Sequence, residues 1–260
     1  MRTYGAEAGW RQRLAFVLLD PEIESFSYEL DDEVQAISAL AAAVGRPAEE
    51  LLAYAAEVRE DPELGRRLWR HLRWRFDLKR RPQLGHRLAW YVLVRAFKPK
   101  LVVETGIYLG FGSLALLRAL DRNAEEGDPG ELMSFDIVPA AGAVVREALR
   151  HRWRRYIGTT KDTLPAALEG RQVDMLFQDT PHTEENQRFE FGLALSHSGE
   201  RLLLMDCSGG YAPTLRSLCA ERGGAYREVA MRSRGHIHPG APLTFAMFDN
   251  RPRAPSGDVG

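Results

Sequence analysis

A glycine-rich turn near the middle of this 260-residue sequence has residue types suited to holding a cofactor. The apolar run 101–103 leads into Glu104, and Gly106, Gly110 and Gly112 follow. This order predicts a buried parallel strand, a tight turn and a helix, the first βα unit of a nucleotide-binding sheet. The glycine spacing is not the dinucleotide GxGxxG, and a carboxylate suits ribose hydroxyls or a cationic amino-acid tail better than a pyrophosphate. We therefore expect S-adenosylmethionine (SAM) as the ligand.

A second set of polar residues follows the later predicted strands. Ligands of open α/β sheets bind at the carboxyl ends of the strands. Asp136 ends the second predicted strand, where an acidic side chain can bridge both ribose hydroxyls and also cap the next helix. Asp179 and His182 follow the fourth strand, and we expect both to take part in catalysis. The other polar residues expected at this end of the sheet are Thr160, Lys161, Asp206, His236 and His238.

His182 is the candidate general base in this set. Histidine titrates near pH ~6.5, so at neutral pH its side chain can take a proton from an acceptor group. Asp179 or Asp206 could pair with it. His236 and His238, in the turn of the last predicted hairpin, are further catalytic candidates.

The chain alternates strands and helices from residue 100 onward, the signature of a parallel sheet. We predict strands at 100–104, 131–136, 154–158, 173–178 and 201–206. We predict helices at 112–121, 139–150, 162–168, 184–197 and 211–222. Two more strand-like segments, 225–231 and 243–249, have no room for a helix between them and should form an antiparallel pair. The expected fold class is α/β, a Rossmann-like seven-stranded sheet of five parallel βα units plus that pair, which distinguishes the methyltransferase sheet from an ordinary dinucleotide fold.

The first part of the chain reads as a helical extension. An apolar-periodic helix begins at Asp31-Asp32 and ends at Gly45, and Pro47 opens a second one. Further helices are expected at 63–76 and 82–96. The expected organisation is an extension over 1–80, acting as a substrate lid or in dimer contacts, a SAM-binding core over 81–250 and a flexible tail over 251–260.

Composition narrows the function classes. The formal net charge of −1 gives no basic field for nucleic acid, so we interpret the basic residues between 66 and 81 as a solvated helix face. Cys207 and Cys219 form neither a disulfide framework nor a zinc motif. The sequence has no signal-peptide pattern and no stretch of membrane-spanning length. We expect a cytoplasmic protein with a small-molecule partner and no membrane partner. A homodimer with contacts through the helical extension is an open alternative.

These motifs resemble the class I SAM-dependent methyltransferases over about residues 84 to 249, and most closely the catechol O-methyltransferase-like group with its macrocin O-methyltransferase-like relatives. The run 104–110 resembles the acidic-x-Gly-x-Tyr-x-Gly turn of that group, and 179–186 resembles the relatives' Asp-x-Asp-His-x-Tyr-Glu pattern. In this resemblance Ser113 lies near the SAM carboxylate, Asp136 on the ribose, and Thr160 and Lys161 at the adenine. The cofactor-binding residues that it implies are Glu104, Gly106, Tyr108, Gly110, Ser113, Asp136, Thr160, Lys161 and Asp179.

The sequence departs from the family pattern at two places, one that affects metal binding and one that affects the catalytic base. Many members bind Mg²⁺ through an Asp after the fourth strand and an Asp-Asp or Asp-Asn pair after the fifth, where this chain has Asp179, Asp206 and Cys207. A thiol is a poor ligand for Mg²⁺, so the sequence leaves open whether Asp179 and Asp206 hold a metal with the help of waters. His182 takes the place of the catalytic lysine of the catechol group.

The expected function is methyl transfer from SAM to a small molecule, with an oxygen of a secondary metabolite or sugar as the first choice. Transfer to nitrogen or carbon, and a non-catalytic SAM-binding member of the fold, remain alternatives. An NAD-dependent oxidoreductase is disfavoured by the glycine spacing and the terminal strand pair. No Asn-Pro-Pro-Tyr motif of amino-group methylases is present, which together with the near-zero charge argues against a nucleic-acid substrate.

Overall fold

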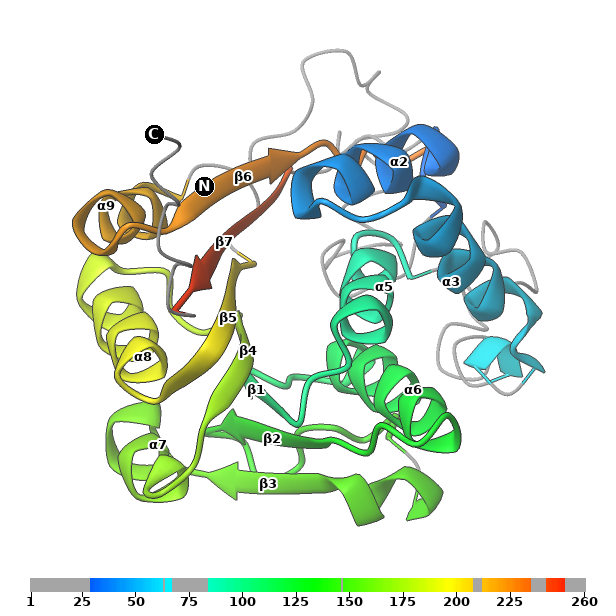
Figure 1. The fold of residues 1–260 in the computed structure, drawn as a ribbon. Helices are drawn as coiled ribbons and strands as arrows, with labels where there is room; N and C mark the ends of the chain where they lie inside the picture. Colours follow the sequence, from blue (N-terminus) through cyan, green and yellow to red (C-terminus); the bar gives the residue numbers. More distant parts are fainter. Residues whose placement is uncertain are drawn as a thin grey trace, which may run out of the picture.

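A seven-stranded sheet forms the centre of the computed structural model, which describes residues 29–62, 64–66, 84–145, 147–207, 212–234 and 242–250. The strand order is β3-β2-β1-β4-β5-β7-β6, and β7 runs antiparallel to both of its neighbours (Figure 1). The strands are β1 (Leu101–Thr105), β2 (Glu131–Asp136), β3 (Trp153–Ile157), β4 (Val173–Gln178), β5 (Ser198–Asp206), β6 (Ala225–Val229) and β7 (Leu243–Asp249). The predicted class, including the terminal antiparallel pair, is confirmed.

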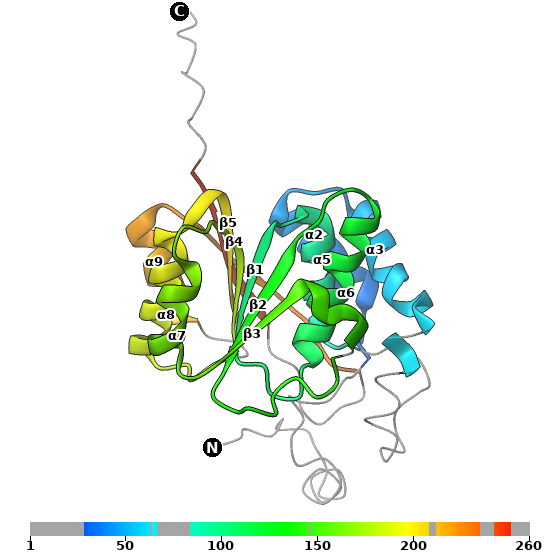
Figure 2. The same ribbon diagram turned by 90° about the horizontal axis from the view of Figure 1, so that it is seen from below.

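Helices cover both faces of the sheet (Figure 2). One face carries α7 (Thr160–Leu168), α8 (Glu184–Ser196) and α9 (Pro213–Arg222). The other carries α5 (Arg87–Phe97) and α6 (Phe111–Glu125); α3 (Ala48–Glu60) packs outside α5, and α2 (Glu33–Val44) packs on α3 and against β6. A separate hydrophobic cluster fills each side of the sheet. Among the described residues, no helix is both long and apolar enough to cross a membrane.

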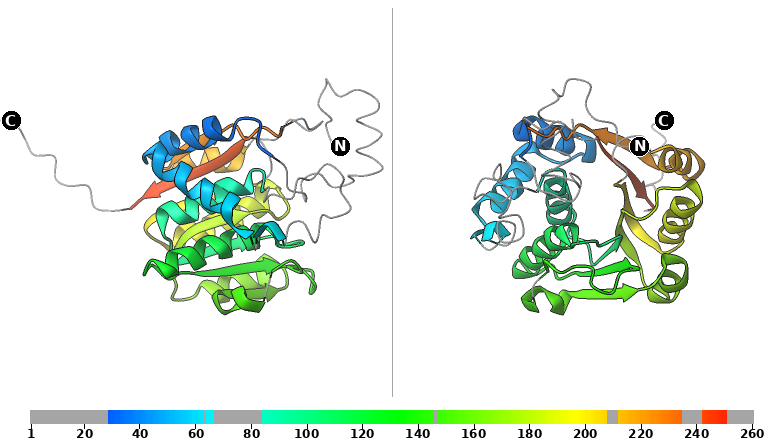
Figure 3. Two further views of the ribbon diagram at one scale, coloured as in Figure 1. Left: turned by 90° about the vertical axis from the view of Figure 1, so that its right-hand side faces the viewer. Right: turned by 180° about the vertical axis from the view of Figure 1, so that it is seen from behind.

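The two N-terminal helices are part of the main core. Asp32 caps the start of α2 by accepting from the Gln35 N–H, and Gly45 ends it at φ +67°, as predicted. Ile37 and Leu40 of α2 and Leu51 of α3 are fully buried in the same cluster as α5 and α6. Figure 3 shows this blue-to-cyan segment lying along one face of the core. The predicted helix 63–76 and the tail 251–260 fall wholly or mostly outside the described residues.

The predicted helix over 139–150 is wrong. The chain makes turns up to residue 145 and then a 3-10 helix over Glu147–Arg152. The N–H of Gly142 donates to the carbonyl of Tyr108 at 2.7 Å, and the N–H of Val144 donates to that of Leu109 at 3.1 Å. Gly142 also has φ +84°, and a Cβ there would lie 2.4 Å from Trp153 Cη2. These N–H groups of the segment therefore bond to the glycine turn instead of to carbonyls within a helix.

Candidate functional site

The glycine turn after β1 is packed backbone to backbone against the loop after β4. Gly106 has φ +89°, and a Cβ on it would lie 2.1 Å from the carbonyl oxygen of Asp179. The N–H of Asp179 donates to the carbonyl of Thr105 at 2.7 Å. Only glycine combines this conformation with so close an approach. The turn therefore fixes where Asp179 lies.

Asp136 holds the same turn from the other side. One carboxylate oxygen accepts from the N–H groups of Ile107 and Tyr108, both at 2.9 Å, and the other accepts from the N–H of Val138 at 2.8 Å. These bonds hold Tyr108 at φ +49°, a conformation that non-glycine residues seldom adopt. Asp136 thus orders the turn, in addition to its predicted place at the ribose.

Glu104 lies under the turn and is only 2 % exposed. Its Oε2 accepts from the hydroxyls of Ser113 and Ser134, each at 2.6 Å. Burial raises the pKa of Glu104 to about 7, against the opposing effect of the two serine hydrogen bonds. Ser113 is fully buried and its hydroxyl binds Glu104, so the structure gives it an internal partner where the resemblance implied a contact with SAM.

Large exposed apolar side chains gather at the carboxyl ends of the first three strands. Tyr108 belongs to the glycine turn, Ile137 and Val138 follow β2, and Ile157 ends β3 beside Asp136. Each exposes at least 41 % of its surface. Sequence reasoning missed the last three, although an apolar pair directly after an acidic strand end was a usable signal. Exposed apolar side chains beside an acidic strand end are suited to contact a flat ring.

Thr160 and Lys161 form the first turn of α7, and the structure gives both side chains partners within the chain. The Thr160 hydroxyl is buried and donates to Glu190 at 2.7 Å, which gives it an internal partner in place of the expected adenine contact. Lys161 is exposed and forms an ion pair with Glu185. Glu190 is fully buried and was missed, because a single glutamate within a helix carries no sequence signal of burial. Its carboxylate also accepts from Thr105, Thr180 and Asn186.

The loop after β4 brings His182 beside two carboxylates. Its Nδ1 lies 2.9 Å from Gln178 Oε1 and 3.7 Å from Asp206 Oδ1, and its Nε2 lies 3.8 Å from Asp179 Oδ1. Gln187, a residue that sequence reasoning missed, donates to Asp206 at 2.8 Å and to Gln178 at 3.3 Å. Because an amide oxygen can only accept, Nδ1 carries the proton and Nε2 is the basic nitrogen of neutral His182.

The two carboxylates of the expected metal site, Asp179 and Asp206, both lie close to His182. His182 lies within 4 Å of both Asp179 and Asp206, and no three His, Cys, Asp or Glu side chains in the described part of the chain could hold a metal ion. Burial raises the pKa of the Cys207 thiol well above its usual range, and the charges of Asp179 and Asp206 add to this, so the thiol stays protonated. His236 and His238 lie outside the described residues.

Comparisons with known proteins agree with this architecture. Residues 103–205 match the family model of a methyltransferase domain. The fold is similar to that of the O-methyltransferase TomG from Streptomyces achromogenes, involved in tomaymycin synthesis and solved in complex with SAM, at 18 % identity and a TM-score of 0.52, over 78 % of this chain and 96 % of TomG. A putative O-methyltransferase from Klebsiella pneumoniae is similar at 16 % identity and a TM-score of 0.52, over 81 % of this chain and 100 % of that one.

A search of curated protein sequences gives no match. The family match runs from β1 into β5, and the likeness to TomG covers 78 % of the chain. Residues 103–205 are therefore similar to a methyltransferase domain, and the chain has the fold of the O-methyltransferases to which it is compared.

Proposed function

We propose that this protein transfers a methyl group from SAM to an oxygen atom of a small-molecule acceptor, with His182 as the general base. The observation that carries the proposal is the position of His182, at the carboxyl end of β4 and within 4 Å of both Asp179 and Asp206. Asp179 in turn packs against Gly106 of the glycine turn. A proton acceptor thus lies next to a residue that packs on the turn that we assign to the cofactor.

The side chains around the turn have the chemistry that SAM requires. Ile137 and Ile157 offer apolar surface to the adenine ring, and Asp136 would accept hydrogen bonds from the ribose hydroxyls. Glu104 would balance the ammonium group of the methionine tail. The first turn of α6 has no side-chain cap, so its N–H groups would favour the carboxylate.

The protein's own groups would position the acceptor and remove its proton. When bound, SAM supplies a methyl group on a positively charged sulfur. Nε2 of His182 would take the proton of the acceptor hydroxyl, while Nδ1 keeps its hydrogen bond to Gln178. Asp179 and Asp206 would stabilise the imidazolium that forms, as a carboxylate does for the histidine of a hydrolase triad. No step of this proposal uses a metal ion.

Calorimetric titration of the purified protein tests the cofactor first. We expect micromolar binding of SAM and none of NAD, with the same SAM affinity before and after treatment with a chelator. His182→Gln should then lower kcat by about 10²- to 10⁴-fold and leave the SAM affinity within about twofold, because it removes only the proton acceptor. His197→Gln, a histidine at the other end of α8, is the matched control. Failure to bind SAM would overturn the function, and unchanged turnover would remove His182 from the chemistry.

A further inference from the structure

A series of buried hydrogen bonds runs from Glu190 of α8 to the imidazole of His182. Glu190 is fully buried, and its two carboxylate oxygens lie 2.9 and 2.8 Å from the hydroxyl oxygen of Thr180. That hydroxyl oxygen lies 3.0 Å from Nε2 of Gln178, and Oε1 of Gln178 lies 2.9 Å from Nδ1 of His182. Two side chains thus connect a buried carboxylate to the candidate base.

The carboxylate of Glu190 determines the direction of these hydrogen bonds. An ionised carboxylate can only accept, so the hydroxyl of Thr180 donates to it. The two lone pairs of that hydroxyl then accept N–H groups from Gln178 and Asn186, both at 3.0 Å. The two ends of a glutamine amide have almost the same shape, so its neighbours determine which end is the nitrogen. The nitrogen of Gln178 must face Thr180, and its oxygen therefore faces His182.

Asp206 favours the same direction from the other side. Gln187 of α8 donates to Asp206 at 2.8 Å and to Oε1 of Gln178 at 3.3 Å. An amide turned the other way would set its own N–H groups against those of Gln187 and leave both without acceptors. Asp206 and Gln187 are buried as well. The two ends of the network therefore agree on the direction of Gln178.

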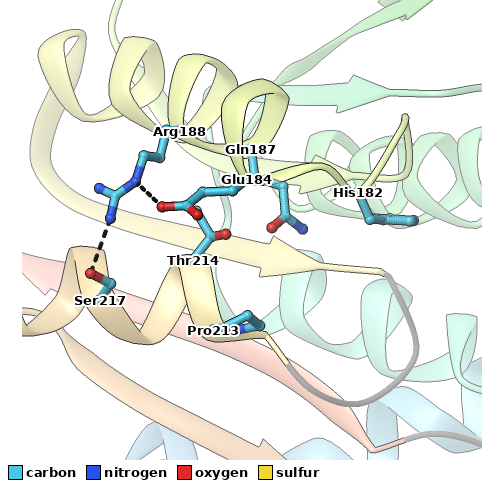
Figure 4. A pocket seen from close by; sticks show the side chains of 7 residues that line it. All are labelled: His182, Glu184, Gln187, Arg188, Pro213, Thr214 and Ser217. Carbon is cyan, nitrogen blue, oxygen red and sulfur yellow. Dashed lines mark hydrogen bonds and ion pairs between the residues drawn. The ribbon is translucent and has the colours of Figure 1, made fainter.

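The network ends at a partly accessible ring. The side chain of His182 is 33 % exposed, and with Gln187 it lines a cavity of about 410 Å³ between the first turns of α8 and α9 (Figure 4). A water molecule in such a cavity can donate or accept, so solvent favours neither of the two neutral forms (tautomers) of the imidazole. The fixed direction of the buried Gln178 is what distinguishes them.

We propose that Glu190 is a positioning residue that keeps the proton of neutral His182 on Nδ1. It acts through the hydroxyl of Thr180 and the amide of Gln178. Nε2 is then the basic nitrogen, the atom to which we assign the proton of the methyl acceptor. The inference rests on the proposed function for this use of Nε2, whereas the position of the imidazole proton can be measured without SAM or an acceptor.

The position of the proton is measured from ¹⁵N–¹H correlation spectra of the protein labelled with ¹⁵N in its histidines, at about pH 8, where an ordinary imidazole is neutral. His182→Gln identifies the signals of His182 by their loss. We expect the Nδ1–H form in the unchanged protein. In Glu190→Gln the new amide can donate to Thr180, whose hydrogen is then free to turn toward Gln178. The ratio of the Nδ1–H to the Nε2–H form should fall about fivefold to tenfold, as the loss of one hydrogen-bond preference implies.

Thr180→Val breaks the same connection and leaves the other donors of Glu190 in place, so it should lower the ratio by a similar factor even if Glu190→Gln does not fold. Thr105→Val is the matched control. The fully buried hydroxyl of Thr105 donates to the same carboxylate at 2.9 Å but is not part of the connection to His182. This variant should destabilise the protein, because it too removes a hydrogen bond to Glu190, and should leave the ratio within about twofold.

An unchanged ratio in either folded variant, Glu190→Gln or Thr180→Val, would overturn the inference and leave the proposed function intact. An equal fall in Thr105→Val would overturn it too, because the effect would then come from loosened packing around the carboxylate. Failure of the proposed function is a separate result. In that case the protein would not bind SAM, or His182→Gln would keep its turnover, and neither finding depends on the tautomer ratios.

Discussion

Glu104 shows how one buried side chain can couple folding to cofactor binding. Its burial raises the pKa of the carboxyl from 4.5 to about 7, so the folded protein keeps a proton there that the unfolded chain releases. Since the folded state then binds more protons between these two pH values, the contribution of Glu104 to stability is present below about pH 4.5 and is lost as the pH rises to about 7. A carboxyl held in this way is ready to ionise when a cation binds next to it.

We predict that Glu104→Gln removes this pH dependence. The quantity to compare is the free energy of unfolding of the variant minus that of the unchanged protein. This difference should be about 3 kcal/mol larger at about pH 7.5 than at about pH 4.5. Urea unfolding at both pH values measures it. Calorimetry near pH 6 in buffers of different ionisation enthalpy should also show proton release on SAM binding for the unchanged protein and none for the variant. Equal proton release in both would mean that Glu104 does not face the SAM ammonium group.

At the scale of single elements, steric contact and backbone conformation both require a glycine in the turn after β1. Gly106 and Gly127 share nearly the same left-handed conformation, φ +89° and +92°, but Gly127 has nothing within 4 Å of an added Cβ. Alanine substitutions at these two positions therefore separate the cost of the left-handed conformation from the cost of a steric clash. The difference lies in the Asp179 carbonyl, which a Cβ on Gly106 would meet at 2.1 Å.

We predict that Gly106→Ala destabilises the protein by more than about 3 kcal/mol and abolishes SAM binding, because the loop after β4 must move away from the turn. Gly127→Ala should cost only about 1 kcal/mol and leave SAM binding unchanged. Thermal or urea unfolding and calorimetry measure the two quantities. Equal losses of stability in the two variants would show that the packing of Asp179 on the turn contributes nothing.

The sequence predicted the elements better than the contacts among them. Alternating apolar runs and turn residues were enough for all seven strands, because buried parallel strands are nearly continuous apolar segments. The segment 139–150 was misjudged since its alanines favour a helix locally, whereas the packing of Gly142 on Trp153 decides against it. The order of the strand ends along one edge of the sheet correctly brought Asp179, His182 and Asp206 together.

The partners of individual side chains could not be predicted in the same way. Thr160 and Ser113 occupy the strand-end positions that the sequence indicated, yet their hydroxyls bind Glu190 and Glu104. Such contacts depend on side-chain directions across elements that are distant in the chain, and strand and helix periodicity does not contain this information. The cavity between α8 and α9 was missed for the same reason, because it exists only where two helix starts face each other.

At the scale of the whole molecule, two largely buried cations join the N-terminal segment to the core, Arg95 of α5 and Arg118 of α6, the latter through Asp61. Arg95 of α5 is 2 % exposed and makes two hydrogen bonds, at 2.8 and 2.9 Å, to Glu57 of α3. It also pairs with Glu126, just beyond the end of α6, and lies over the ring of Tyr54. The helices of the extension therefore share both an apolar core and the ion pair of the buried Arg95 with the rest of the fold.

This joint predicts that the extension and the core unfold together. Arg95→Met should lower the free energy of unfolding by about 3–5 kcal/mol, because it removes the cation that pairs with Glu57 and leaves that carboxylate with the neutral hydroxyl of Tyr91, and should increase hydrogen exchange across both α3 and α5. Arg122→Met, which removes an exposed pair with Glu125, should cost less than about 1 kcal/mol. A lid that moves as a separate body would instead give Arg95→Met two unfolding transitions, with exchange raised in α2 and α3 alone. Two transitions would support the expected boundary between extension and core near residue 80. A single transition would mean that the extension does not move as a separate lid, so that any closing motion over the acceptor would come from the loops at the strand ends.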